Sequence, residues 1–98
     1  MYEIELTEEF SNWLDKLQDS KAQKIVVKRI RTISLGTFGD IHSLGKGLFE
    51  AKIHYGPGYR LYFVNKGERI IIMLCGGDKS TQQRDIANAK KMAEELNK

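Results

Sequence analysis

Three runs of residues that favour β-strands fill the chain between Leu48 and Cys75, and their pattern constrains the fold more than any other feature. The connections between them, Gly56-Pro57-Gly58 and Lys66-Gly67-Glu68, have the length and composition of hairpin turns. The last run is apolar on both of its faces, which predicts a central strand that is covered on both sides. We therefore predict an antiparallel meander with strands over 48–55, 59–65 and 69–75.

Alternation along the first two runs divides their side chains between the two faces of the predicted sheet. One face is apolar and contains Phe49, Ala51, Ile53, Tyr55, Tyr59, Leu61 and Phe63. The other face displays a polar set, Glu50, Lys52, His54, Arg60 and Tyr62. We expect the apolar face to pack on helices and the polar face to carry the chemistry. A solvated sheet face with Glu–Lys pairs across strands is the alternative interpretation.

The N-terminal third is predicted to form a strand and a helical hairpin. Apolar and charged residues alternate from Tyr2 to Leu6, which indicates an edge strand. Thr7 is a typical N-cap, and the apolar spacing after it predicts a helix that ends near Gln18. Ser20 and Gln23 have the spacing of a capping box for a second helix, which ends at Gly36. The buried stripe expected on this second helix is Ala22, Ile25, Val26, the aliphatic stem of Arg29, Ile30 and Ile33.

The glycine-rich segment 36–47 is predicted to be a loop, and the residues after Cys75 are predicted to form a turn and a terminal helix. Gly76 and Gly77 permit a tight turn, and Ser80 with Gln83 gives a second capping-box spacing. The terminal helix is expected to bury Ile86, Ala89, Ala93 and Leu96. Together these elements predict one α+β domain over residues 1–98.

Charge and composition narrow the class of function. The 98 residues suit one domain, and the net charge of +3 divides into −1 for residues 1–45 and +4 for residues 46–98. This bias favours a polyanionic partner such as RNA. The single cysteine excludes an internal disulfide, and the chain has no signal-peptide pattern and no apolar run of about 18 residues. We therefore expect a cytoplasmic protein that does not enter a membrane.

The sequence predicts neither a metal nor a nucleotide cofactor. His42, His54 and Cys75 lack the close spacing of zinc ligands, and the glycines match no phosphate-binding loop. The polar set is instead expected to meet Lys79 and Asp85 at one end of the sheet. Cleavage of RNA without a metal needs such groups, because a base must take the 2′-hydroxyl proton, cations must stabilise the scissile phosphate and an acid must protonate the leaving 5′-oxygen.

Two blocks of sequence carry a more specific signal. The first is Phe49-Glu50-Ala51-Lys52-Ile53 followed by Gly56-Pro57-Gly58-Tyr59-Arg60-Leu61-Tyr62-Phe63. The second is Gly76-Gly77-Asp78-Lys79 followed by Thr81, Gln82, Asp85, Ile86 and Ala89. With Phe10, Trp13 and Leu14 in the helical hairpin before them, these blocks resemble the addiction-module killer proteins of the RelE/ParE toxin superfamily, close to its HigB-like branch. The resemblance extends through nearly the whole chain.

This resemblance implies a RelE-like fold with a curved antiparallel sheet and a toxin that, in the RelE and HigB branches, cuts mRNA in the ribosomal decoding site. It implies that Arg60 binds the scissile phosphate with Lys52 and Lys79 as further cations. We expect Asp85, Glu50 or His54 to move the proton. The RNA-binding residues predicted with them are Lys46, Lys52, Arg60, Tyr62, Lys79 and Gln82.

The resemblance also implies partners. These are the ribosome with its mRNA and a cognate antitoxin, which in this family often carries a helix-turn-helix domain, so that operator DNA is bound only through the antitoxin. A ParE-like toxin that inhibits DNA gyrase without chemistry of its own is the alternative from another class. A nucleic-acid-binding module without either activity is the third interpretation.

Overall fold

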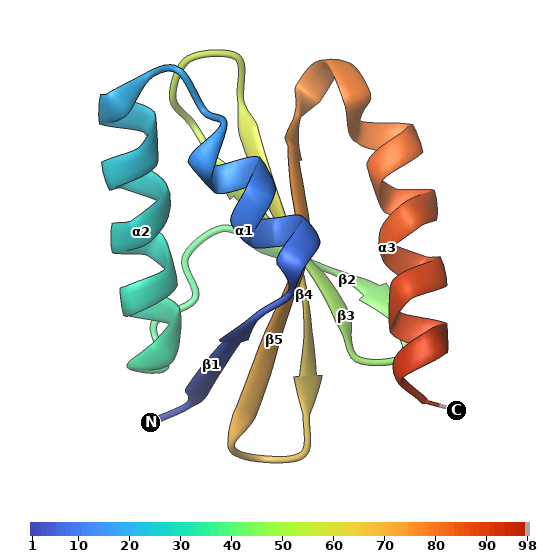
Figure 1. Ribbon diagram of the computed structural model, residues 1–98. Coiled ribbons are helices and arrows are strands. Elements are labelled where there is room, and N and C mark those ends of the chain that lie inside the picture. Colours follow the sequence, from blue (N-terminus) through green and yellow to red (C-terminus); the bar gives the residue numbers. More distant parts are fainter. Residues whose placement is uncertain (98) are drawn as a thin grey trace.

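A five-stranded mixed sheet lies between two layers of helices in the computed structural model, which describes residues 1–97 (Figure 1). The order of the strands across the sheet is β1-β5-β4-β3-β2. The elements are β1 (Glu3–Leu6), α1 (Glu8–Asp15), α2 (Ser20–Ser34), β2 (Ile41–Gly45), β3 (Leu48–Ile53), β4 (Tyr59–Lys66), β5 (Ile70–Asp78), a 3₁₀ turn η1 (Lys79–Thr81) and α3 (Gln82–Leu96). The predicted α+β class and the C-terminal helix are confirmed.

Each face of the sheet has its own core. The helices α1 and α2 cover one face, where Phe10, Val26 and Ile33 pack with strand residues such as Leu61 and Phe63. The helix α3 covers the other face, and the buried residues there are Leu48, Tyr62, Val64, Ile72, Leu74, Cys75 and Ala89. Strand β5 therefore contributes side chains to both cores, as its uniformly apolar sequence predicts.

The sheet is mixed and not antiparallel as predicted, because β1 pairs with β5 in parallel. Glu3 lies opposite Ile70, and Leu6 lies opposite Met73. The predicted edge position of this strand is correct. No hairpin joins β1 to its neighbour, so no turn sets its direction, and alternation within a strand carries no information about direction.

The predicted loop 36–47 contains a strand that the sequence analysis missed. Strand β2 pairs antiparallel with β3, with Ile41 opposite Ala51 and His42 opposite Glu50. It is an edge strand with only two apolar side chains, Ile41 and Leu44, so it lacks the alternation by which strands are recognised. Its turn into β3 uses positive φ angles at Gly45, Lys46 and Gly47.

Helix boundaries differ from the predictions where two capping residues compete. Thr7 caps α1 as predicted, since its hydroxyl accepts from the Phe10 amide at 3.0 Å, but the helix ends at Asp15 and not near Gln18. The cap of α2 is Asp19 and not Ser20, because the Asp19 carboxylate accepts from two backbone amides of the first turn. The amide of Gln23 instead donates to the Leu14 carbonyl at the end of α1.

The C-terminal boundaries shift in the same way. Strand β5 continues through Gly76 and Gly77, which were predicted to form a turn, and ends at Asp78. Asp78 and Thr81 form the capping box in place of Ser80 and Gln83, and α3 begins at Gln82. The exposed fraction of Leu96 is 38%, so the predicted buried stripe of this helix ends before it.

Arg29 contributes more than the buried stem predicted for it. Its guanidinium donates to the backbone carbonyls of Phe38, Lys52 and Asp40 at 3.0, 2.9 and 3.0 Å. These three bonds fix the segment between α2 and β2 against the end of β3.

Candidate functional site

The three predicted phosphate-binding cations come from segments that meet at one end of the sheet. They are Lys52, Arg60 and Lys79. Lys52 in β3 lies directly opposite Arg60 in β4. Lys79 follows Asp78, whose partner in β4 is Tyr59, the residue before Arg60. A side chain built at Gly58 would lie 3.6 Å from the Cβ of Lys79, so the β3–β4 turn also reaches this residue. The strand pairing therefore brings these three residues to the same end of the sheet.

The polar face of the sheet is buried under α3 and is not displayed to solvent as predicted. Exposed fractions are 3% for Glu50, 8% for Arg60 and 0% for Tyr62. Lys52 is half-buried, and Lys79 beyond the end of β5 is exposed. Arg60 is thus covered by protein, whereas the two lysines at the same end of the sheet are more exposed.

Glu50 is the hub of this buried polar cluster. Its Oε2 accepts hydrogen bonds from the Tyr62 hydroxyl at 3.0 Å and from Nε2 of Gln82 at 2.9 Å. The same oxygen lies 3.7 Å from Nη1 of Arg60. Because Gln82 is the first residue of α3, this carboxylate ties the helix to β3 and β4.

Arg60 is the least satisfied member of the cluster. Its Nε and Nη1 are buried and have no hydrogen-bond partner within the described residues. A buried guanidinium with unpaired N–H groups is costly, and its planar fork matches the oxygens of a carboxylate or phosphate. Both atoms are buried, so an oxyanion could accept hydrogen bonds from them only after the side chains around Arg60 move.

Tyr62 acts in this cluster as a hydrogen-bond donor. Burial first, and then the neighbouring Glu50 carboxylate, hold the pKa of the Tyr62 phenol well above its usual value. The hydroxyl therefore stays protonated and keeps donating to Glu50 at neutral pH. Tyr62 was predicted to be displayed with the cations as an RNA-binding residue, but in the structure it is fully buried.

Asp85 lies against the backbone of β5. A Cβ added at Gly77 would collide with the Asp85 carboxylate, so only glycine fits at this position. Gly77 is the direct partner of Arg60 in the sheet, which places Asp85 beside the buried cluster. Thr81 Oγ1 donates to the Asp85 carboxylate at 2.5 Å, and Nε of Arg84 lies 3.8 Å from its other oxygen.

Because Gly76 and Gly77 have no Cβ, side chains from other elements pack directly against the backbone of β5. The indole ring of Trp13 occupies the space beside Gly76, as Asp85 does beside Gly77. Thr81 is a member of this site that the sequence analysis quoted within a motif without assigning it a role. Its position four residues before Asp85, on consecutive helical turns, is the signal that predicts such a pair.

His54 lies at the margin of the site, beyond the end of β3, and is exposed. Its Nε2 hydrogen-bonds to Asp40 at 2.7 Å, and Nε2 of His42 lies 3.2 Å from the other oxygen of the same carboxylate. The hydrogen bond to His54 and the charge of His42 lower the pKa of the Asp40 carboxyl. Asp40 was not identified from the sequence, because the loop predicted for 36–47 gave no pairing with β3.

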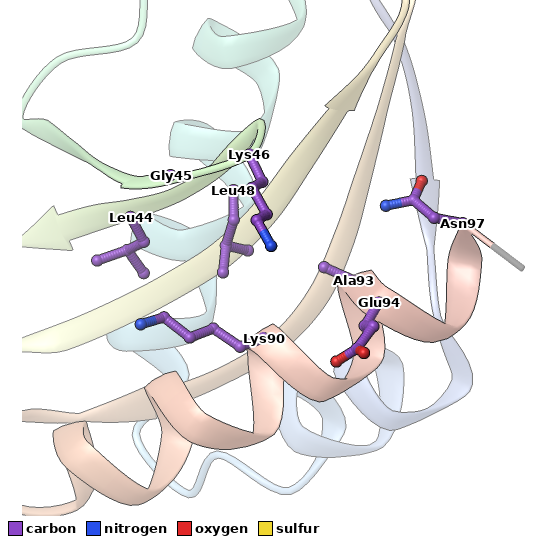
Figure 2. A pocket seen from close by; sticks show the side chains of 8 residues that line it. All are labelled: Leu44, Gly45, Lys46, Leu48, Lys90, Ala93, Glu94 and Asn97. Carbon is purple, nitrogen blue, oxygen red and sulfur yellow. The ribbon is translucent and has the colours of Figure 1, made fainter.

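Lys46 is not brought to the other predicted RNA-binding residues. It lies in the β2–β3 turn, roughly 20 Å along the strand from Lys52. There it lines a cavity of about 460 Å³ together with Lys90 and Glu94 of α3. Figure 2 shows Lys46 and Leu48 side by side on the strand side of the cavity, with Lys90 on the helix below them. This cavity lies at the other end of the sheet from Arg60.

The described residues contain no group of three or more histidine, cysteine, aspartate or glutamate side chains that could hold a metal ion. Cys75 is a buried strand residue, as predicted, and burial raises the pKa of its thiol to about 12. Between residues 1 and 97, no helix has both the length and the apolar character needed to cross a membrane.

The five-stranded mixed sheet with helices on both faces defines an α+β fold. Residues 12–97 match the phage-derived Gp49-like family (DUF891), and the chain belongs to this family. An uncharacterized protein of Haemophilus influenzae is 46% identical over 94 residues, which span 96% of this chain and 95% of the relative.

Two solved structures share the fold. One is a chain in the crystal structure of the Escherichia coli DinJ–YafQ complex, with a TM-score of 0.58 and 17% identity over 83% of this chain and 97% of that one. The other is the solution structure of the conserved hypothetical protein HP0894 from Helicobacter pylori, with a TM-score of 0.53 and 23% identity over 82% of this chain and 97% of that one. At these identities the similarity establishes the RelE-like fold.

Proposed function

We propose that this chain is the toxin of a type II toxin–antitoxin system, close to the HigB-like branch, and that it cleaves mRNA on the ribosome without a metal ion. The observation that carries the proposal is the buried Arg60 guanidinium, whose Nε and Nη1 have no partner in the described structure. It lies at an end of the sheet where Lys52 and Lys79 also meet. An unpaired guanidinium, with two further cations on neighbouring segments, has the charge that would favour a phosphodiester.

In this proposal the chain performs an intramolecular transesterification of RNA. A base takes the proton of the 2′-hydroxyl, the 2′-oxygen bonds to phosphorus, and the bond from phosphorus to the 5′-oxygen breaks. An acid then protonates the departing 5′-oxygen, which leaves a 2′,3′-cyclic phosphate. Arg60, Lys52 and Lys79 stabilise the charge that builds on the phosphate oxygens.

Glu50 fits a positioning role better than the predicted role of proton carrier. Its Oε2 is already engaged by Tyr62 and Gln82, and only 3% of the residue is exposed. The proposal keeps two groups for proton transfer: His54, which is exposed, and Asp85, which is 8% exposed and accepts from Thr81. Asp85 lies beside Gly77, the partner of Arg60, and His54 lies at the solvent-facing margin next to Asp40.

The test is brief induction of the chain in a bacterial host, with mapping of new RNA 5′-ends in the presence and absence of translation. We expect discrete cuts within translated messages. Arg60→Lys keeps the charge but loses the fork, so the cleavage rate should fall by about 100-fold or more. The control is Lys66→Gln, an exposed charge at the far end of β4, which should cleave at the wild-type rate.

Intact transcripts with DNA damage would instead assign the chain to gyrase inhibition, as in ParE-like toxins. RNA binding without cuts would leave only a nucleic-acid-binding module. Comparing Asp85→Asn with His54→Gln in the same assay separates the two proton carriers, since only the group that moves the proton should be required for cleavage.

The proposed protein partner is an antitoxin encoded by the neighbouring open reading frame. The name of the DinJ–YafQ complex supports a protein partner for this fold. A helix-turn-helix domain on the antitoxin would give the complex its contact with operator DNA, and the toxin alone would contact only the ribosome and mRNA. Co-expression should restore growth; failure of the neighbouring product to do so overturns the partner assignment.

A further inference from the structure

The outer face of α2 is strongly basic. The helix carries Lys21, Lys24, Lys28, Arg29 and Arg31 and no acidic residue. Arg29 turns inward to backbone carbonyls. Lys24, Lys28 and Arg31 remain on the outside, exposed and without an ion pair among residues 1–97.

Two large apolar side chains lie among these cations. The exposed fractions are 54% for Val27 and 56% for Leu35. Val27 lies three residues after Lys24 and four before Arg31, so the three side chains are neighbours on successive turns. Val27 and the three cations line a shallow hollow of about 360 Å³. We call Lys24, Val27, Lys28, Arg31 and Leu35 the α2 face.

We propose that the α2 face is a docking surface for an acidic amphipathic segment of a partner protein. Carboxylates of the segment pair with the row of cations, and its apolar side chains cover Val27 and Leu35. A nucleic acid would satisfy the charges, but its phosphate backbone has no apolar surface to place against Val27. The mixture of charge and apolar surface therefore favours protein.

The α2 face and the Arg60 site lie on opposite sides of the sheet. Helices α2 and α3 cover opposite faces of the sheet (Figure 1). Helix α2 packs on the core that contains Phe10 and Phe63, whereas Arg60 lies beside Glu50, which accepts a hydrogen bond from Gln82 of α3. A segment bound to α2 therefore leaves the Arg60 site uncovered. Docking and RNA cleavage are separable by mutation.

The experiment measures the affinity of the purified chain for the product of its neighbouring open reading frame, a probe whose choice rests on the proposed function. Val27→Gln should weaken binding about fivefold to tenfold, since it removes the burial of a half-exposed valine. The triple change Lys24→Gln, Lys28→Gln and Arg31→Gln should weaken binding about tenfold and flatten its salt dependence. The matched control replaces the exposed Lys66, Lys90 and Lys91 by Gln, with the same change of net charge, and should stay within twofold of wild type.

Wild-type affinity in both α2 variants, or no binding of the probe to the wild-type chain, overturns the docking proposal. Loss of binding to a single-stranded RNA oligonucleotide by the triple variant, with protein binding unchanged, would make the α2 face a nucleic-acid surface and also overturns it. RNA cleavage by the same variants is measured in a separate assay. If the chain cleaves RNA and the α2 variants bind the probe as the wild type does, the docking surface is refuted and the proposed function is unaffected.

Discussion

The pair formed by Glu50 and Arg60 allows a quantitative test of the buried cluster. Glu50→Gln removes the negative charge while keeping the shape. Two charge-assisted hydrogen bonds, from Tyr62 and Gln82, become ordinary ones, at a cost of about 1 kcal/mol each. Arg60 also loses the counter-charge at 3.7 Å, and breaking a buried pair from one side raises the total cost to about 3–5 kcal/mol.

Arg60→Met should lower the free energy of unfolding by about 3 kcal/mol, because it leaves the buried Glu50 carboxylate without its counter-charge. The carboxylate keeps its hydrogen bonds from Tyr62 and Gln82 in this variant. In the Arg60→Met background, Glu50→Gln should then cost about 2 kcal/mol, because only the hydrogen bonds weaken. The expected coupling between the two positions is thus about 2 kcal/mol.

Urea unfolding of the four proteins in the cycle measures this coupling. Trp13, the only tryptophan, packs beside Gly76 and Tyr59, so its fluorescence reports the folded state. Free energies that add to within about 0.5 kcal/mol would refute the argument, because Glu50 would then not hold Arg60. A change in the slope of the free energy with urea would instead show that the native or denatured state, or the two-state character of unfolding, had changed.

Two further changes have expected outcomes. Arg29→Ala removes three hydrogen bonds to backbone carbonyls and should lower the free energy of unfolding by about 2–4 kcal/mol. Lys28→Ala, at the exposed neighbouring position, should change it by less than about 0.5 kcal/mol. Equal urea midpoints for the two variants would show that Arg29 does not fix the segment between α2 and β2. The pKa of the Cys75 thiol rises from 9.0 to about 12 on folding, so above pH 9 the unfolded chain binds fewer protons and stability falls by up to about 1.4 kcal/mol per pH unit. Cys75→Ala should flatten that slope between pH 9 and 10 in the same unfolding assay, and an unchanged slope would show that the thiol does not titrate this way.

The meander could be predicted from the sequence because its signals are local. Hairpin turns at Gly56-Pro57-Gly58 and Lys66-Gly67-Glu68 set the direction of β3, β4 and β5, and alternation set their faces. Strand β2 and the parallel direction of β1 have no such local signal, since each depends on the neighbour it meets. The competition between Asp19 and Ser20 shows the same limit at a cap, because both residue types suit the position.

The sequence predicted that the polar residues beside Arg60 share one face of the sheet, but it did not predict their burial. Alternation shows that Glu50, Arg60 and Tyr62 share a face, but it does not show which element covers that face. The contact between Gln82 and Glu50 spans 32 positions and depends on where α3 packs. Asp85 against Gly77 likewise follows from the packing of α3 on β5. Lys46 was assigned by charge alone, and the turn that carries it points to the other end of the sheet.

The burial of Arg60 restricts how a polymer could reach it. Helix α3 covers the polar face, so the proposed cleavage requires a phosphodiester to approach from the end of the sheet where half-buried Lys52 and exposed Lys79 lie. A partner held on the α2 face would sit across the sheet from that entrance. To inhibit the proposed cleavage, such a partner must therefore extend a further segment around the edge of the sheet to the lysines, or displace Gln82 and with it the start of α3. The second route would free Glu50 from one of its two donors and loosen Arg60, which links inhibition to the same hydrogen bond that orders the site.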